Sequence, residues 1–400
     1  MFNQLVLKYF EKLETPFYFY DTGLLHKTLF AIKEAANLYH YTIHYAVKAN
    51  ANERILRIIS SYGLGADCVS GNEIERALNC GFTPNKIVFA GVGKTDQEIK
   101  YSIDENISCI NCESIEELQV INSIAQASKK KVRVALRINP NIDANTHHHV
   151  TTGLSSNKFG ISQYELMLII KNINTFKNLQ INGLHFHIGS QITDLNVFKE
   201  LIKVVNTFQN FLREQNIEIS YINLGGGLGI DYENPESQIP DFQTYFSGFN
   251  KSLQIFNGQT VLFEPGRSIV GQCGSLISRV LFVKNNGDRK TIILDSGFTE
   301  LLRPALYQAN HKIINLSSNK SLEEYDIAGP ICETSDYFGR SILLPSTQRG
   351  DLIAILSVGA YGEVMASQYN LRTIASKYFS EDIKPKLEKS KTIFHNHYLF

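Results

Sequence analysis

Short apolar runs of strand length alternate with helix-length segments eight times up to about residue 270, and this alternation limits the possible folds more than any other feature. The segments between the runs, such as NERILRIISSYG and GNEIERALNCG, repeat apolar residues at the spacing of a helix. Eight consecutive strand and helix units predict an α/β fold with a (β/α)8, TIM-like barrel. The eight runs are YTIHYAV from residue 41, GADCVS from 65, KIVFAG from 86, ISCINC from 107, KVRVALRIN from 131, INGLHFHIGS from 181, YINLGGG from 221 and TVLFEPG from 260.

The sequence changes character after about Gly271. Runs such as YDIAGPIC and DLIAILSVGAY are separated by turns, and helices no longer alternate with them. This pattern predicts a C-terminal β domain of the β-sandwich or β-barrel type. The N-terminal TPFYFYD is a further strand that precedes the barrel pattern. We therefore expect a barrel over residues 26–270 and a β domain made of residues 1–25 and 271–400.

Charge and composition exclude several classes of function. Lysine plus arginine and aspartate plus glutamate each number 39, so the chain has no basic excess for a nucleic-acid partner. No run is long enough to cross a bilayer and the N-terminus lacks a secretory signal, so we expect a cytoplasmic protein without a membrane partner. Six cysteines are too sparse for a disulfide framework, and CINC from residue 109 lacks the second pair of a zinc site.

Polar or glycine residues follow most of the expected strands. In a (β/α)8 barrel the catalytic groups lie at the C-terminal ends of the strands. Lys48 has two interpretations: its amine reaches solvent from the strand end, or it is a Schiff-base lysine made nucleophilic by apolar neighbours. The strand-end residues are Lys48, Asp67, Ser70, Asn139, His187, Gly225, Gly226, Gly227 and Glu264.

The glycine run NLGGGLGI after the seventh strand indicates an anion site. It is not the dinucleotide fingerprint, because Ile230 stands where that motif needs its third glycine. Three consecutive glycines expose backbone N–H groups, and phosphate sites in barrels favour the loops after strands seven and eight. Glu264 at the end of strand eight needs a cationic or N–H partner, for which a protonated pyridine nitrogen is one candidate. Arg267 could bind phosphate or a substrate carboxylate.

The H-x-H pair of His185 and His187 has two competing interpretations. Such a pair holds the metal ion of barrel hydrolases. Alternatively, one imidazole lies flat against an aromatic cofactor ring, with Ser190 near the phosphate. The other strand ends lack the rest of a metal-ligand set, so the combination favours pyridoxal phosphate and no metal. A second histidine cluster, 147–149, lies in a polar stretch and is not expected to bind metal.

Eight blocks in order give the chain a family resemblance. From about residue 15 to residue 370 it resembles the diaminopimelate decarboxylases, pyridoxal-phosphate enzymes of the alanine-racemase-like fold type. The blocks are YAVKAN, GADCVSGNEI, HFHIGSQI, NLGGGLGI, EPGRSIV, LRPALY, GPICETSD and GAYGEVMAS.

The resemblance implies decarboxylation of meso-2,6-diaminopimelate to L-lysine and carbon dioxide, the last step of lysine biosynthesis. It implies that Lys48 forms the Schiff base with the cofactor, that His187 stacks on the ring and that Cys332 donates a proton. In this family the Cys-Glu segment enters the partner's active site, which implies a homodimer with shared sites and a β domain that completes them. Cofactor binding is expected from Lys48, Asp67, His187, Ser190, Gly225, Gly226, Gly227, Glu264, Gly266, Arg267 and Tyr361. Substrate binding is expected from Arg267, Arg303, Tyr307, Glu333 and Tyr361.

Several alternatives stay open. Relatives that decarboxylate ornithine, arginine or carboxynorspermidine share the cofactor blocks, although ornithine-type enzymes typically carry Cys-Asp where this chain has Cys332 and Glu333. A racemase usually places arginine opposite the pyridine nitrogen, where this chain has Glu264. Non-catalytic cofactor carriers lack the β domain. The chain departs from the family pattern at Asn72, usually glycine, and at Thr334 and Ser335, which leaves its fine substrate specificity open.

Overall fold

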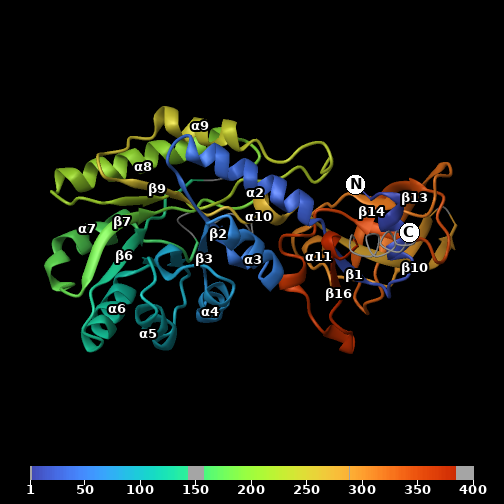
Figure 1. Cartoon of the computed structure of the whole chain (residues 1–400), viewed down its shortest axis with the longest axis horizontal. Helices are drawn as coiled ribbons and strands as arrows, with labels where there is room; N and C mark the ends of the chain where they lie inside the picture. The colour runs from blue at the N-terminus through green and yellow to red at the C-terminus, as the bar shows by residue number, and fades with distance from the viewer. Residues whose placement is uncertain (1, 143–156, 288, 384–400) are drawn as a thin grey trace, which may run out of the picture. The chain divides into compact units, whose positions relative to one another are not determined.

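The computed structural model describes residues 2–142, 157–287 and 289–383, which group into two compact units (Figure 1). We call Thr28–Ile230 with Pro240–Ile269 the barrel unit, and Met1–Lys27 with Asp231–Ile239 and Val270–Phe400 the β unit. The segment Asp231–Ile239 lies inside the range expected for the barrel, yet it groups with the β unit. The side-chain amide of Gln272 in the β unit donates hydrogen bonds to the carbonyl oxygens of Pro235 and Gln238 in this segment, at 2.7 and 2.9 Å.

The barrel unit is built around a closed, parallel, eight-stranded barrel, as the alternation of strands and helices predicted. Neighbouring strands pair in chain order, and the parallel pairing of the first with the last, with Thr42 opposite Leu262, closes the ring. The strands are β2 (Thr42–Ala46), β3 (Gly65–Cys68), β4 (Ile87–Phe89), β5 (Cys109–Cys112), β6 (Val132–Arg137), β7 (Leu179–His185), β8 (Tyr221–Asn223) and β9 (Thr260–Phe263).

Hydroxyl side chains cap the N-termini of several of the barrel helices. Ser70, Thr95, Ser114 and Ser162 each accept a hydrogen bond from the backbone N–H three residues later, which is the N-cap arrangement. Ser70, which the sequence grouped with the strand-end candidates, therefore caps a helix. The helices are α3 (Glu53–Ser61), α4 (Gly71–Asn79), α5 (Asp96–Asp104), α6 (Ile115–Ala127), α7 (Gln163–Lys171), α8 (Asn196–Glu214), α9 (Phe242–Ser252) and α10 (Arg267–Val270), while α2 (Thr22–Asn37) spans the boundary between the units.

The CINC motif forms part of the barrel interior. Cys109 packs with Val88 and Leu262, and its sulfur lies 3.0 Å from the hydroxyl of Tyr221. That hydroxyl also donates to Asn111 Oδ1 at 3.1 Å. Burial raises the pKa of the Cys109 thiol to about 12, so it is a neutral, packed side chain and not a thiolate ligand.

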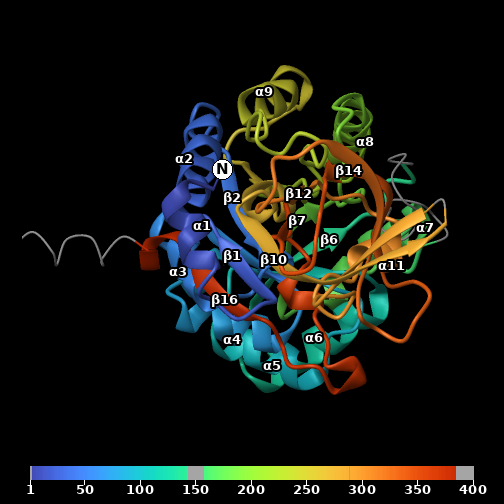
Figure 2. The same ribbon diagram turned by 90° about the vertical axis from the view of Figure 1, so that its right-hand side faces the viewer.

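The β unit is a mostly antiparallel sheet that includes the N-terminal strand. β1 (Phe17–Tyr20) pairs antiparallel with β10 (Gly274–Asn286), with Phe17 opposite Ile277, and parallel with β16 (Ser376–Phe379) (Figure 2). Phe10 at the end of α1 (Gln4–Phe10) packs beneath this sheet in one apolar cluster with Phe17 and Ile277. The remaining elements are β11 (Arg289–Leu294), α11 (Arg303–Tyr307), β12 (Ile313–Asn315), β13 (Leu322–Ala328), β14 (Tyr337–Pro345) and β15 (Leu352–Ile355).

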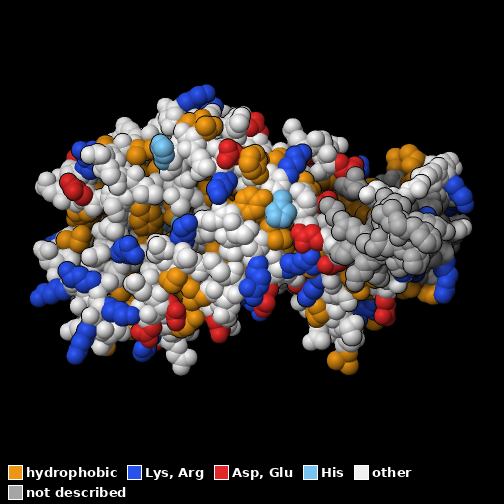
Figure 3. Space-filling model, viewed as in Figure 1, with side chains coloured by type: hydrophobic (Ala, Val, Ile, Leu, Met, Phe, Trp, Pro, Cys, Tyr) orange, Lys and Arg blue, Asp and Glu red, His pale blue; other side chains and the backbone are white. Residues whose placement is uncertain are grey.

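The surface carries charges of both signs, as the balanced composition requires. Lysine and arginine side chains are interspersed with aspartate and glutamate on the face shown in Figure 3. Within the three described stretches, no helix is long and apolar enough to span a membrane.

Candidate active site

Lys48 lies just beyond β2, in a single 3-10 turn, Val47–Ala49. Its Nζ is 2.9 Å from Oδ2 of Asp67, which stands on the neighbouring strand opposite Ala46. Asp67 is fully buried, and no described residue pairs with its second oxygen, Oδ1. Burial raises the pKa of Asp67 to about 6; the charge of Glu264 adds to this effect and Lys48 opposes it. The amine is therefore held in place by a buried carboxyl group.

Glu264 follows β9 and is buried, with a separate partner for each carboxylate oxygen. Asn223 Nδ2 donates to Oε1 at 2.5 Å, and His185 Nε2 lies 3.1 Å from Oε2. Burial by itself would raise the pKa of Glu264, but the charge and hydrogen bond of His185, together with Lys48 and Asn223, hold it well below its usual range. Glu264 is thus an anion inside the C-terminal end of the barrel.

The glycine run after β8 packs against two other strand ends with no room for side chains. A Cβ on Gly226 would lie 2.3 Å from the carbonyl oxygen of Glu264, and one on Gly225 would lie 2.3 Å from that of Phe186. Gly225 and Gly227 have φ of +65° and +114°, which favour glycine. The run is a tight backbone turn of the kind that can approach an anion closely.

His187 is half-buried immediately after β7, and its ring is oriented by the glycine run. The backbone N–H of Gly226 donates to Nδ1 at 3.2 Å, so the neutral ring carries its proton on Nε2. Burial lowers the pKa of His187 well below its ordinary value, and the charges of Lys48 and Arg137 lower it further. His187 is therefore a neutral, fixed aromatic ring.

Ser190 and Arg267 meet beside the glycine run. The buried guanidinium donates to the hydroxyl of Ser190 from Nη2 at 2.9 Å and from Nε at 3.3 Å. Gly266 precedes the arginine, and a Cβ there would lie 2.9 Å from Cβ of Ala49, so the chain after β9 packs tightly on the turn that carries the lysine. The barrel unit thus brings together the cofactor residues that the sequence assigned to it.

The two histidines of the H-x-H pair have different partners, Glu264 for His185 and the backbone of Gly226 for His187. Across the described residues, no group of three histidine, cysteine, aspartate or glutamate side chains is placed to hold a metal ion. The cluster at 147–149 lies outside those residues.

In the β unit, Arg303 and Tyr307 stand at opposite ends of the short helix α11. The buried Arg303 guanidinium lies 4.7 Å from the ring centroid of Tyr232, and its Nη1 is 2.7 Å from Nε2 of His311. Tyr361 is partly buried and has φ of +58°. Arg303 is therefore fixed in direction by two aromatic neighbours.

Cys332 and Glu333 form an exposed pair on the β unit, after β13. The backbone N–H of Cys332 donates to Asn370 Oδ1 at 3.2 Å, and Glu333 Oε1 accepts from the hydroxyl of Tyr369 at 2.8 Å. Cys332 is an exposed free thiol, unlike the five buried cysteines. The segment is therefore tied to the turn around residue 370 and accessible from solvent.

Two residues near the strand ends escaped the sequence analysis. Asn223 lies opposite His185 in the pairing of β7 with β8, and it also accepts the N–H of Gly225 at 2.9 Å. Glu73 accepts from the N–H of Val69 at 2.8 Å, and burial raises its pKa to about 7. The signal for Asn223 was its position two residues before the glycines, whereas nothing in the sequence marks Glu73, which reads as a residue of the first turn of α4.

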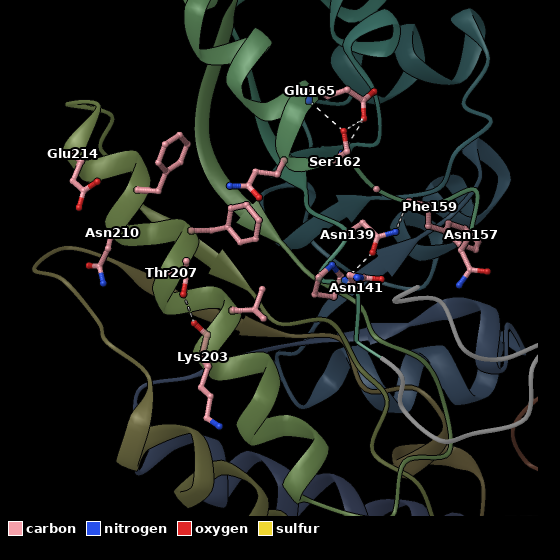
Figure 4. A pocket seen from close by; sticks show the side chains of 16 residues that line it. Asn139, Asn141, Asn157, Phe159, Ser162, Glu165, Lys203, Thr207, Asn210 and Glu214 are labelled. Carbon is pink, nitrogen blue, oxygen red and sulfur yellow. Dashed lines mark hydrogen bonds between the residues drawn. The ribbon is translucent and has the colours of Figure 1, made fainter. Parts of the chain in front are cut away.

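A cavity of about 1010 Å³ lies elsewhere in the barrel unit, between α8 and the residues 139–141 and 157–165 (Figure 4). Lys203 and Thr207 line it from α8, and Asn139 is the strand-end residue that borders it. The amide of Asn139 donates to the carbonyl oxygen of Phe159 and accepts from the N–H of Asn141, so it stabilises the turn. The cavity does not contain the lysine, glutamate and glycine residues described above.

Comparisons with known proteins agree with this arrangement. Residues 25–271 match the family model of the pyridoxal-dependent decarboxylase, pyridoxal binding domain. The diaminopimelate decarboxylase of Bacteroides thetaiotaomicron is 53% identical over 376 residues, which cover 94% of this chain and 97% of that protein. Among solved structures, a variant of diaminopimelate decarboxylase from Helicobacter pylori complexed with L-lysine has a TM-score of 0.88 and 38% identity, covering 96% of this chain and 99% of that one. The enzyme from M. jannaschii in complex with L-lysine has a TM-score of 0.86 and 37% identity, covering 94% of this chain and 89% of that one.

Proposed function

The chain belongs to the diaminopimelate decarboxylases of the pyridoxal-dependent decarboxylase family, and from this premise we propose the reaction and the roles of its residues. It is a carboxy-lyase that uses pyridoxal phosphate and removes one carboxyl group of meso-diaminopimelate as carbon dioxide, leaving L-lysine. The observation that carries this conclusion is the 53% identity over 94% of the chain. A cytoplasmic location remains a prediction.

The strand-end residues of the barrel unit fit the cofactor. Glu264 is a buried anion for a protonated ring nitrogen, the tight glycine turn after β8 can present backbone N–H groups to a phosphate, and Lys48 offers an amine at the same end of the barrel. The buried Asp67 Oδ1, for which the described chain offers no partner, can accept a further donor. When bound, pyridoxal phosphate supplies an electron sink for the pair left behind as carbon dioxide departs.

Each barrel residue has a proposed task around that group. Lys48 Nζ binds it covalently, and Asp67 Oδ2 orients Nζ through their 2.9 Å contact. Glu264 keeps the ring nitrogen protonated, which preserves the electron sink. The neutral ring of His187, oriented by the N–H of Gly226, would stack on the cofactor ring. Ser190, Gly225, Gly226, Gly227, Gly266 and Arg267 bind the phosphate.

The β unit is proposed to supply substrate recognition and a proton. Arg303, with Arg267, forks a substrate carboxylate, and Glu333 pairs with the distal ammonium, since diaminopimelate carries an amino acid group at each end. Tyr307 and Tyr361 provide further hydrogen bonds, and Tyr361 also contacts the cofactor. Cys332 Sγ delivers the proton that replaces the lost carboxyl group.

We also propose a homodimer in which the Cys332 and Glu333 segment of one chain enters the active site of the partner. The exposure of this pair supports the proposal, because an acid and an ammonium ligand must reach a substrate. Whether the protein is a dimer or a monomer, the proposed substrate is a small amino acid.

Direct competition tests the proposed substrate. Purified enzyme loaded with pyridoxal phosphate receives equal concentrations of meso-diaminopimelate and ornithine, and L-lysine, putrescine and carbon dioxide are quantified. We expect lysine as the dominant product, and Glu333→Asp to reduce this preference because the shorter acid suits a different distance to the ammonium. Faster release of putrescine would overturn the assignment.

A further inference from the structure

His185 is a buried histidine that the assignments above leave without a role. It ends β7, is 1% exposed, and stands in register with Asn223 on β8, which in turn pairs with Leu262 on β9. Three adjacent strands thus bring His185, Asn223 and Glu264 together inside the C-terminal end of the barrel. An apolar side chain could fill this buried position, so a histidine here indicates a polar role.

The hydrogen bonds fix the direction of donation. An ionised carboxylate only accepts, so the 3.1 Å contact requires a proton on Nε2 of His185. Asn223 Nδ2 donates to the other oxygen, and Asn223 Oδ1 accepts from the N–H of Gly225, which fixes the orientation of the amide. The two oxygens of Glu264 are therefore held separately by two donors from neighbouring strands.

His187 provides an internal comparison. Its Nδ1 accepts from the backbone of Gly226, so a backbone group sets its tautomer. The Nδ1 of His185 is buried and has no partner among the residues in the described ranges. The contact with Glu264 is then the polar interaction that determines how the ring of His185 is oriented and protonated. The two histidines therefore have different partners and do not bind one metal ion together.

We propose that His185 is a positioning residue for Glu264, and that its Nε2–H, together with the amide of Asn223, keeps this carboxylate ionised and aimed at the ring nitrogen of the cofactor. The inference rests on the proposed function, because it gives Glu264 that target. Without the two donors, a carboxylate buried to this extent would favour its protonated form. A protonated Glu264 is neutral and could not stabilise the proton on the ring nitrogen. The electron sink would therefore weaken.

The test compares His185→Leu, which removes the donor, with His185→Gln, whose amide can donate from nearly the same position. Each protein is loaded with pyridoxal phosphate labelled with ¹⁵N in the ring, and the ¹⁵N chemical shift reports whether that nitrogen is protonated. We expect a protonated nitrogen in the parent protein and in His185→Gln. In His185→Leu we expect a shift toward the unprotonated form and cofactor affinity weaker by roughly tenfold or more, as for loss of a hydrogen bond to a charged group. His44→Leu, at another buried barrel histidine, is the matched control and should leave the signal unchanged.

An unchanged nitrogen signal in a folded His185→Leu protein would overturn the inference and leave the proposed function intact. A second measurement is independent of the cofactor. Infrared difference spectra of the cofactor-free proteins at neutral pH should show an additional protonated carboxyl band in His185→Leu, beyond the signals that Asp67 and Glu73 give in the parent, and this band should disappear when Glu264→Gln is added. Absence of that band would also contradict the role of His185, whereas failure of the parent protein to bind pyridoxal phosphate would contradict the proposed function alone.

Discussion

Replacing Asp67 by asparagine should remove a loss of stability that the parent protein undergoes as the pH rises from about 4 to just above 6. Burial raises the pKa of Asp67 from 3.8 to about 6, so the folded state binds this proton more tightly than the unfolded state. The carboxyl group therefore contributes most stability at low pH, and this contribution is lost as the pH rises through about 6. The pKa of Asp67 differs by about two units between the folded and unfolded states, and each unit is worth roughly 1.4 kcal/mol of stability. The total effect is about 3 kcal/mol, of which about 2.5 kcal/mol falls between pH 4 and 8.

Urea unfolding of the cofactor-free parent and Asp67→Asn proteins at several pH values measures this difference. The NH2 group of the new asparagine is a buried donor that needs a partner, and leaving it without one would lower the stability of the variant by the same amount at every pH. We expect the free energy of unfolding of the variant, relative to that of the parent, to increase by about 2.5 kcal/mol as the pH rises from 4 to 8. Its catalytic efficiency should fall, because Lys48 loses the carboxylate that orients it. Asp104→Asn is the control, since the hydrogen bond from Lys100 lowers the pKa of that exposed carboxyl group and the trend should have the opposite sign. A stability difference that does not change with pH would refute the reasoning.

Two further substitutions test the packing and charge of the barrel rim. A Cβ on Gly226 would lie 2.3 Å from a carbonyl oxygen, so Gly226→Ala should weaken cofactor binding by roughly tenfold or more in equilibrium dialysis; Gly93→Ala, with no atom within 4 Å of the new methyl, should bind normally. Lys94→Met should lower the free energy of unfolding by about 3 to 5 kcal/mol, because it leaves the carboxylate of Glu117 without its cationic partner. In the parent, an oxygen of Glu117 lies 2.6 Å from the buried Lys94 amine. Equal, small effects of Lys94→Met and of the exposed Lys100→Met would contradict this estimate.

The barrel could be predicted from sequence because its signal is repetitive. Eight apolar runs separated by helical segments leave few alternatives. Ser70 was grouped with the strand-end candidates, and only the structure identifies it as a helix cap. The N-terminal strand was recognisable, and its place beside β10 depends on long-range pairing of Phe17 with Ile277. Residues 231–239 group with the β unit through contacts distant in sequence, such as those of Gln272 with Pro235 and of Arg303 with Tyr232, and no local sequence pattern predicts such contacts.

The candidate site was predictable where one residue type has few other uses. Three consecutive glycines after a strand indicate an anion site on their own, whereas Lys48 alone also fits a lysine that reaches solvent, and its role was predicted from the combination with the other strand ends and from the family resemblance. Asn223 was missed because asparagine at a strand end is common, and its importance depends on strand register. The role of His185 was likewise open, since the H-x-H spacing fits a metal as well as it fits two separate partners.

The site of cofactor attachment tests the account most directly. Purified protein is incubated with pyridoxal phosphate, reduced with borohydride, digested and analysed by mass spectrometry, while an unreduced sample is assayed for lysine release from meso-diaminopimelate. We predict a single pyridoxyl modification on the peptide that contains Lys48, no modification in Lys48→Ala, and lysine release by the parent protein alone. Attachment at a different lysine, or lysine release that persists in Lys48→Ala at the parent rate, would contradict the account.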